Sequence, residues 1–208
     1  MKWIVRRLLR ETNRKNQKVI FMSNDEIFLD SSKKLFRYYK GLADKAIHQL
    51  SEEQVLQKPN EASNSIALIV HHLTGNMISR FTDFLTTDGE KPWRNREAEF
   101  NEAYPNKAAM LVAWEKGWAC LFTALDAMKP EDLSRLIYIR NEGQSVLEAF
   151  QRQLAHYSSH VGQIVYQAKV LKGDDFVSLS IPKGGSADFN KDKFSQEKGR
   201  RHFTEGLK

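Results

Sequence analysis

Residues 145–171, SVLEAFQRQLAHYSSHVGQIVYQAKVL, decide the fold class and carry the most informative chemistry of the chain. Apolar side chains recur there every three or four positions: Leu147, Phe150, Leu154, Tyr157, Val161, Ile164, Val165 and Ala168. This spacing is typical of one face of an amphipathic helix. Gly173 follows as a natural C-terminal stop. The sequence therefore predicts a long helix over about residues 145–171.

Three further stretches show the same periodicity. They predict helices over about 25–50, from Ser63 or Asn64 to about 85, and over 107–128. Four long amphipathic helices indicate an all-α protein, a four-helix bundle. A long loop, about 86–106, separates the second and third helices, and a short extended segment at 135–140 precedes the fourth. We expect the C-terminal tail to lie extended on the bundle at first, with its last ~15 residues loose.

Charge is distributed unevenly along the 208 residues. The net charge is +6, but residues 1–22 contribute +6 and residues 183–208 contribute +3, which leaves −3 for the rest. We therefore expect a basic leader over 1–22, a single bundle domain over 23–190 and a polar tail over 191–208. An acidic body argues against nucleic acid binding through the fold itself. No apolar run is long enough to predict a membrane span.

The N-terminal leader and the cysteine content bear on location. The start MKWIVRRLLR is interrupted by arginines and makes a poor secretory signal. An unstructured leader is the simplest interpretation; a basic helix that binds a membrane surface or a partner, and an arm that contacts RNA, are the alternatives. The single cysteine, Cys120, rules out an internal disulfide and fits a reducing cytosol. We expect a cytoplasmic protein.

Six histidines are present, and two of them share a helix face. His156 and His160 are four apart, close enough to hold one metal ion. His71 and His72 lie midway along the second predicted helix, where adjacent side chains point about 100° apart, so only one can face the same neighbour. Each histidine taken alone could simply face solvent. Three histidines from two helices of one small bundle point instead to a metal site.

Several better-known sites are disfavoured. Position 157 is Tyr where the His-Glu-x-x-His motif needs its Glu, which disfavours a metalloprotease. No strand, Gly-x-Ser-x-Gly and helix element supports a serine hydrolase. The fourth helix offers only Glu148 well before His156, so the carboxylate-rich di-iron pattern fails as well.

Four segments together resemble the DinB-like (YfiT-like) metalloenzyme superfamily, and within it a bacterial branch of uncharacterised proteins. They are residues 64–76 (NSIALIVHHLTGN), 79–93 (SRFTDFLTTDGEKPW), 154–164 (LAHYSSHVGQI) and 178–184 (SLSIPKG). The resemblance covers about residues 24–190. It implies a four-helix bundle with a divalent metal, zinc or nickel, held by His72, His156 and His160, with His71 as the fallback for the first ligand. It also implies a homodimer.

Characterised relatives in that superfamily use low-molecular-weight thiols, so the resemblance implies a metal-dependent thiol S-transferase. Three neutral imidazoles leave an open metal position, and a thiol bound there is deprotonated and becomes a good nucleophile. We expect thiolate attack on a small electrophilic substrate, with hydrolysis as a variant. The alternatives are a non-catalytic, structural metal-binding dimeric module and a protein that acts through its basic ends.

Residues near the histidines are secondary candidates. Asn76 and Gln163 could contact ligands or substrate, although such residues more often solvate a helix face. Arg80, Arg94 and Arg96 could bind a carboxylate-rich thiol. Pairing of the loop arginines with Glu97 or Glu99 is the expectation that we favour.

Overall fold

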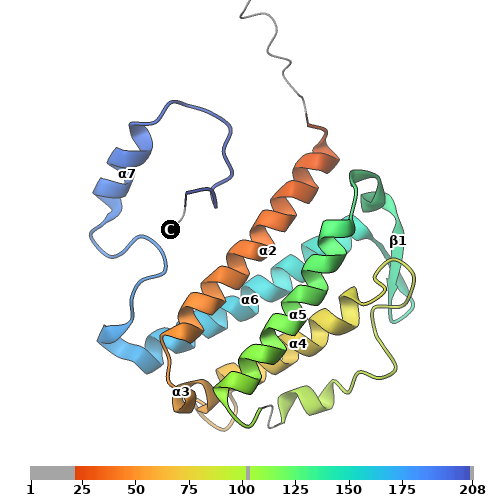
Figure 1. Ribbon diagram of the computed structural model, residues 1–208, viewed down its shortest axis with the longest axis horizontal. Helices are drawn as coiled ribbons and strands as arrows, with labels where there is room; N and C mark the ends of the chain where they lie inside the picture. Colours follow the sequence, from red (N-terminus) through yellow and green to blue (C-terminus); the bar gives the residue numbers. More distant parts are fainter. Residues whose placement is uncertain (1–21, 102–103, 207–208) are drawn as a thin grey trace, which may run out of the picture.

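The chain is mostly helical. The computed structural model describes residues 22–101 and 104–206, and within them it has six α-helices and one two-stranded sheet (Figure 1). The helices are α2 (Asn24–His48), α3 (Glu52–Leu56), α4 (Ile66–Phe81), α5 (Lys107–Ala127), α6 (Val146–Lys172) and α7 (Ser186–Phe194). The strands are β1 (Leu136–Ile139) and β2 (Glu142–Ser145), and the 3₁₀ turns are η1 (Glu97–Phe100), η2 (Pro130–Ser134) and η3 (Gly173–Asp175).

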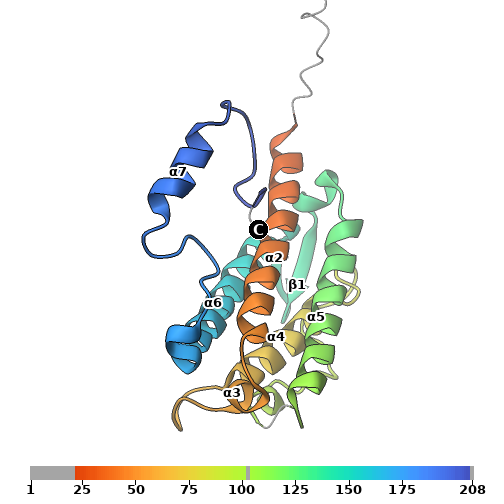
Figure 2. The ribbon, with the colours of Figure 1, turned by 60° about the vertical axis from the view of Figure 1, so that its left-hand side comes forward.

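The four long predicted helices are all present. Helices α2, α4, α5 and α6 lie side by side in both ribbon views (Figures 1 and 2). Helix α4 packs on α5, α2 packs on α6, and α4 and α6 also contact each other. The large, fully buried side chains that join them come from all four helices: Phe36, Leu73, Met77, Trp114, Trp118, Phe150 and Tyr157.

Side-chain caps place the helix starts. Ser145 accepts a hydrogen bond from the Glu148 backbone at the start of α6, and the Glu148 side chain in turn accepts from Ser145. The second predicted helix is shorter than expected, because Ser65 is its N-cap and Thr82 its C-cap. Asp83, with φ of 47°, then turns the chain away, so the expected boundaries at residues 63 or 64 and at 85 were wrong.

Three short elements escaped the sequence analysis. Strand β2 pairs antiparallel with β1, so the predicted extended piece is half of a hairpin whose turn residues, Arg140 and Asn141, both have positive φ. Helix α3 has only five residues and α7 only nine. Neither is long enough to show a sustained apolar stripe, which is why periodicity does not reveal them.

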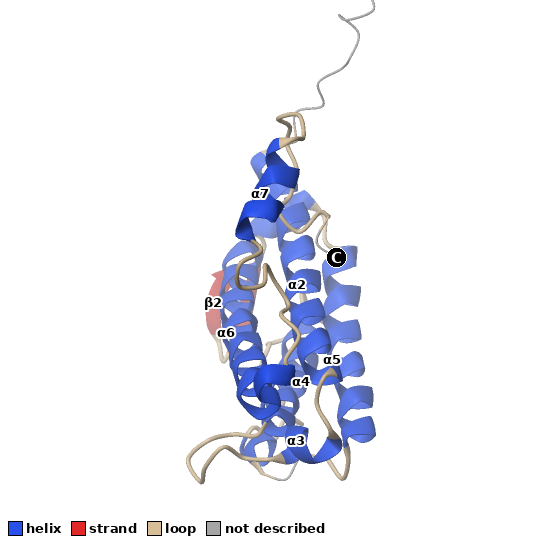
Figure 3. Ribbon diagram, turned by 90° about the vertical axis from the view of Figure 1, so that its left-hand side faces the viewer, coloured by secondary structure: helices blue, strands red, loops and turns tan. Residues whose placement is uncertain are grey.

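The C-terminal tail starts as expected and then differs. Val177 exchanges hydrogen bonds with the side chain of Gln49, at the end of α2. Helix α7 stands away from the long helices (Figures 1 and 2), in front of them in the view of Figure 3, and buries none of its residues. The last described residues return to α2, where His202 contacts Ser31 at 3.2 Å and Glu205 pairs with Lys34 at 2.8 Å. The expectation of a loose end was therefore wrong for these residues.

Two predictions concern the outer parts of the chain. The expected basic leader, 1–22, falls almost wholly outside the described residues. Within the part of the chain that the structure describes, no helix has both the length and the apolarity needed to cross a bilayer.

Candidate metal centre

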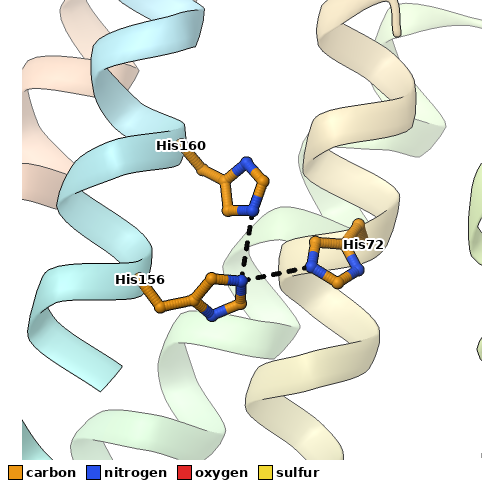
Figure 4. Close-up of side chains that lie close together, drawn as sticks. All are labelled: His72, His156 and His160. Atoms are coloured by element: carbon orange, nitrogen blue, oxygen red, sulfur yellow. Dashed lines mark hydrogen bonds between the residues drawn. The ribbon is translucent and has the colours of Figure 1, made fainter. Parts of the chain in front are cut away.

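The three predicted ligands meet in space. His72 projects from α4, and His156 and His160 project from successive turns of α6 toward it (Figure 4). The Nε2 atom of His156 lies 3.3 Å from Nε2 of His72 and 3.1 Å from Nε2 of His160. The possible ligand atoms of the three residues all lie within 4.8 Å of one another. His72 is buried, whereas His156 and His160 are half-buried and border solvent.

His71, the alternative first ligand, does not join this group. Its ring packs edge-on against Tyr104, with ring centroids 5.2 Å apart. The two neighbouring histidines point in different directions, as their helical spacing requires, and the structure brings His72 to the cluster.

Hydrogen bonds at the outer ring nitrogens define the tautomers of two histidines. Nδ1 of His72 lies 2.9 Å from Oε2 of Glu99, and Nδ1 of His160 lies 3.0 Å from Oε1 of Gln163. Both partners are acceptor oxygens, so each Nδ1 carries the proton and each Nε2 is left with a lone pair. Both lone pairs face Nε2 of His156, which can donate at most one proton to one of them. The protein alone therefore leaves one lone pair in the cluster without a donor.

The electrostatics favour the neutral forms of His156 and His160. Burial lowers the pKa of His156 to about 4, and the neighbouring rings of His160 and His72 add to the effect. Burial also lowers the pKa of His160. Neutral imidazole is the form that binds metals, so at neutral pH these two rings need lose no proton before they can act as ligands.

The donor set and two of its three nitrogen–nitrogen distances fit a divalent transition metal. Nitrogen ligands about 2.0–2.1 Å from a tetrahedral zinc ion lie about 3.3 Å from each other. The two Nε2 to Nε2 distances, 3.3 Å and 3.1 Å, match that spacing. Imidazole suits zinc and nickel alike, so the geometry does not choose between them. A cation would also satisfy all the converging lone pairs together.

Glu99 is the functional candidate that sequence reasoning undervalued. It is 3% exposed and sits at η1, in the loop between α4 and α5. Arg94 donates to both its oxygens, from Nε to Oε1 at 2.7 Å and from Nη2 to Oε2 at 2.9 Å. Burial works to raise the pKa of Glu99, but the hydrogen bonds from His72 and Arg94 outweigh it and the pKa is lowered. The carboxylate is thus charged where it meets His72.

The other secondary candidates have structural partners. The favoured pairing of loop arginines with acidic residues is confirmed for Arg94 with Glu99 and for Arg96 with Glu97, whose charged atoms lie 3.6 Å apart. Gln163 contacts the candidate ligand His160, as considered. Asn76 instead accepts a hydrogen bond from the buried hydroxyl of Tyr157 at 2.9 Å.

Arg80 and Cys120 stay outside the histidine cluster. The guanidinium of Arg80 is buried and bonds to Glu90 and to the carbonyl of Gly89. Cys120 is half-buried and lies 3.6 Å from the hydroxyl of Thr82.

Comparison with known proteins identifies the family. Residues 23–185 match the family described as Protein of unknown function (DUF1572), so the chain belongs to that family. The description names no activity. Neither the curated proteins nor the solved structures contain a match to this chain.

Proposed function

We propose that the protein is a divalent-metal-binding member of the DinB-like superfamily, a four-helix bundle in which His72, His156 and His160 hold zinc or nickel. The convergence of imidazole lone pairs on Nε2 of His156 carries this proposal. The tautomers set by Glu99 and Gln163 support it, because they leave an Nε2 lone pair in the cluster without an N–H donor, and a cation would bind such lone pairs.

The number of ligands favours a reaction centre over a structural site. Structural zinc sites usually have four protein ligands, whereas catalytic sites have three and keep a position open. The cluster offers three, and two of its members border solvent. The alternative of a structural dimeric module has no comparable support from this geometry.

We propose a metal-dependent thiol S-transferase as the activity, with hydrolysis as the variant. A bound metal would supply Lewis acidity and would lower the pKa of a thiol or of water. Glu99 and Gln163 keep the ring protons of His72 and His160 on the Nδ1 atoms, so that the Nε2 atoms are free to bind the metal. Phe100 stacks on the ring of His72, with centroids 5.1 Å apart, and shields one face of it. A homodimer and a cytoplasmic location stay predictions.

The first experiment measures metal content. Protein purified without chelators or an affinity metal should contain about one zinc or nickel ion per chain by mass spectrometry. His72→Ala, His156→Ala and His160→Ala should each lose it. His48→Ala is the matched control, because His48 is exposed and bonds only to the backbone of Asp44 in its own helix. A metal-free wild-type protein that takes up neither ion would contradict the proposal.

The second experiment tests the activity. Metal-loaded protein is mixed with a panel of low-molecular-weight thiols and a chromogenic electrophile, and thioether formation is followed. Turnover that disappears in His156→Ala supports the transferase. Metal binding without turnover by any thiol, and without hydrolysis of ester or amide substrates, would favour the structural module.

A further inference from the structure

We infer that Glu99 is the positioning residue of the metal centre: from the loop between α4 and α5 it fixes the tautomer and orientation of His72. Arg94 holds the carboxylate of Glu99 in place, and Gly75 leaves the space that it occupies. This inference rests on the proposed function for its effect on metal binding. The tautomer itself belongs to the metal-free protein and can be measured independently.

The contact between Glu99 and His72 is buried and directional. Both residues are less than 7% exposed, and Oε2 of Glu99 lies 2.9 Å from Nδ1 of His72. A carboxylate can only accept, so this bond fixes the proton on Nδ1 and aims Nε2 at His156. Carboxylate partners of metal-binding histidines act in this way, and their loss typically weakens metal binding by about 10- to 100-fold.

Arg94 places the carboxylate. Its guanidinium binds Glu99 through two parallel hydrogen bonds, and the side chain of Arg94 is only 2% exposed. Such a bidentate pair fixes both position and plane. Arg94 also faces Glu90 at 3.6 Å, which ties this end of the loop to the segment that follows α4.

Gly75 makes room for the carboxylate. It lies three residues after His72, on the same side of α4. A Cβ atom at position 75 would overlap Oε1 of Glu99 and lie 2.8 Å from its Cδ. Any larger residue must therefore push the carboxylate aside. Glycine is a poor choice in the middle of a helix, and its presence at this point is explained by the approach of Glu99.

Two variants test the role of Glu99 and leave all three histidines unchanged. Glu99→Ala removes the acceptor, and Gly75→Ala displaces it while replacing glycine with a better helix former. Glu97→Ala is the control for the first, because Glu97 lies in the same turn with its side chain 88% exposed. Gly41→Ala is the control for the second, because a Cβ there meets nothing within 4 Å. Circular dichroism confirms that each protein is folded.

The readouts are zinc affinity and the protonation of the His72 ring. Zinc affinity, measured by competition with a chromophoric chelator, should fall about 10- to 100-fold in Glu99→Ala and Gly75→Ala and stay within about twofold in both controls. In the metal-free wild type with ¹⁵N-labelled histidine, His72 should carry its proton on Nδ1. In both test variants the proton should be distributed between Nδ1 and Nε2. A His72→Gln spectrum assigns the signals.

The outcomes separate the two proposals. Unchanged zinc affinity together with an unchanged His72 spectrum in either folded test variant would overturn the role of Glu99. If the wild type binds no metal, the proposed function fails, and the His72 spectrum alone decides whether Glu99 positions the ring. Glu99→Gln keeps an acceptor oxygen but loses the charge that faces Arg94, so its affinity should lie between those of Glu99→Ala and the wild type.

Discussion

The two nitrogens of His72 face different neighbours. Nδ1 donates to a buried carboxylate, while Nε2 faces the imidazole of His156. The first contact can stabilise the metal-free protein, and the second belongs to the proposed metal site. Substitutions that keep one nitrogen and remove the other can separate the two contributions.

His72→Asn should abolish metal binding but keep most of the stability, because its amide nitrogen can occupy the place of Nδ1 and donate to Glu99. His72→Ala should lose both and be less stable than His72→Asn by about 1–2 kcal/mol, since it removes a buried donor from a charged acceptor. Urea unfolding of the metal-free variants measures the difference. Equal stabilities would show that the bond to Glu99 contributes nothing to folding.

At the scale of elements, α4 and α5 approach each other closely at Gly117. A Cβ there would lie 2.9 Å from Cε of Met77 and 3.1 Å from Cα of Thr74, and the second of these is a backbone atom that cannot turn aside. The absence of a side chain at Gly117 therefore sets how closely these two helices pack.

Gly117→Ala should consequently be less stable than Gly41→Ala by about 1–3 kcal/mol, the usual cost of overpacking a tight contact. Both changes gain the same helix propensity, so comparing the two variants isolates the packing. Thermal unfolding at matched concentration measures it. If both variants gain the same stability, Gly117 is not needed for the packing of α4 on α5 at this point.

The loop after α4 is fastened to the hairpin by Asp88. Its carboxylate accepts backbone N–H bonds from Glu90, Arg140 and Asn141, at 2.7–2.9 Å. Burial works to raise the pKa of Asp88, but these bonds outweigh it, and the pKa lies below the ordinary 3.8. The charged form is therefore favoured in the folded state, and its contribution to stability is complete above about pH 4 and lost as the pH falls further.

Asp88→Asn should destabilise the protein by about 1–2 kcal/mol at pH 7, because the neutral amide offers only one acceptor oxygen. The gap to the wild type should narrow at pH 3 and below, where the wild-type carboxyl begins to take up its proton. Urea unfolding at several pH values gives both curves. Parallel curves across this range would contradict the assigned role.

The elements also show what sequence reasoning can reach. The periodic stripes gave the four long helices and placed two candidate ligands one turn apart on α6 and a third on α4, because helical spacing determines facing directions. They could not place Glu99, which comes from an irregular loop and meets His72 across 27 positions. The feature that marks Glu99 is its buried pairing with Arg94. This pairing depends on the path of the loop, which hydrophobic periodicity does not encode.

For the molecule as a whole, the family match ends at residue 185, just before α7. Within the segment beyond it, α7 has no buried residue, and the last described residues meet α2 at the surface, through contacts such as the ion pair of Glu205 with Lys34. Exposed ion pairs of this kind contribute little to stability. The core and the three histidines of the candidate metal centre lie outside this segment.

Deleting residues 186–208 should therefore lower the melting temperature by less than about 4 °C, the shift that about 1 kcal/mol produces in a domain of this size. The zinc affinity should not change. Differential scanning calorimetry and the chelator competition assay check the two statements. A loss of cooperative unfolding would mean that the returning segment is part of the core.

His72 and His156 are 84 positions apart in the chain, with α5, the hairpin and the first turns of α6 between them. A metal held by both would act as a removable cross-link across that span, present in the folded chain and absent from the unfolded one. Free metal at 100 times its dissociation constant would then add about 2.7 kcal/mol to the cost of unfolding. The ion that supplies the chemistry would also hold α4 against α6. Removal of the metal would therefore lower the stability of the folded protein as well as abolish its activity.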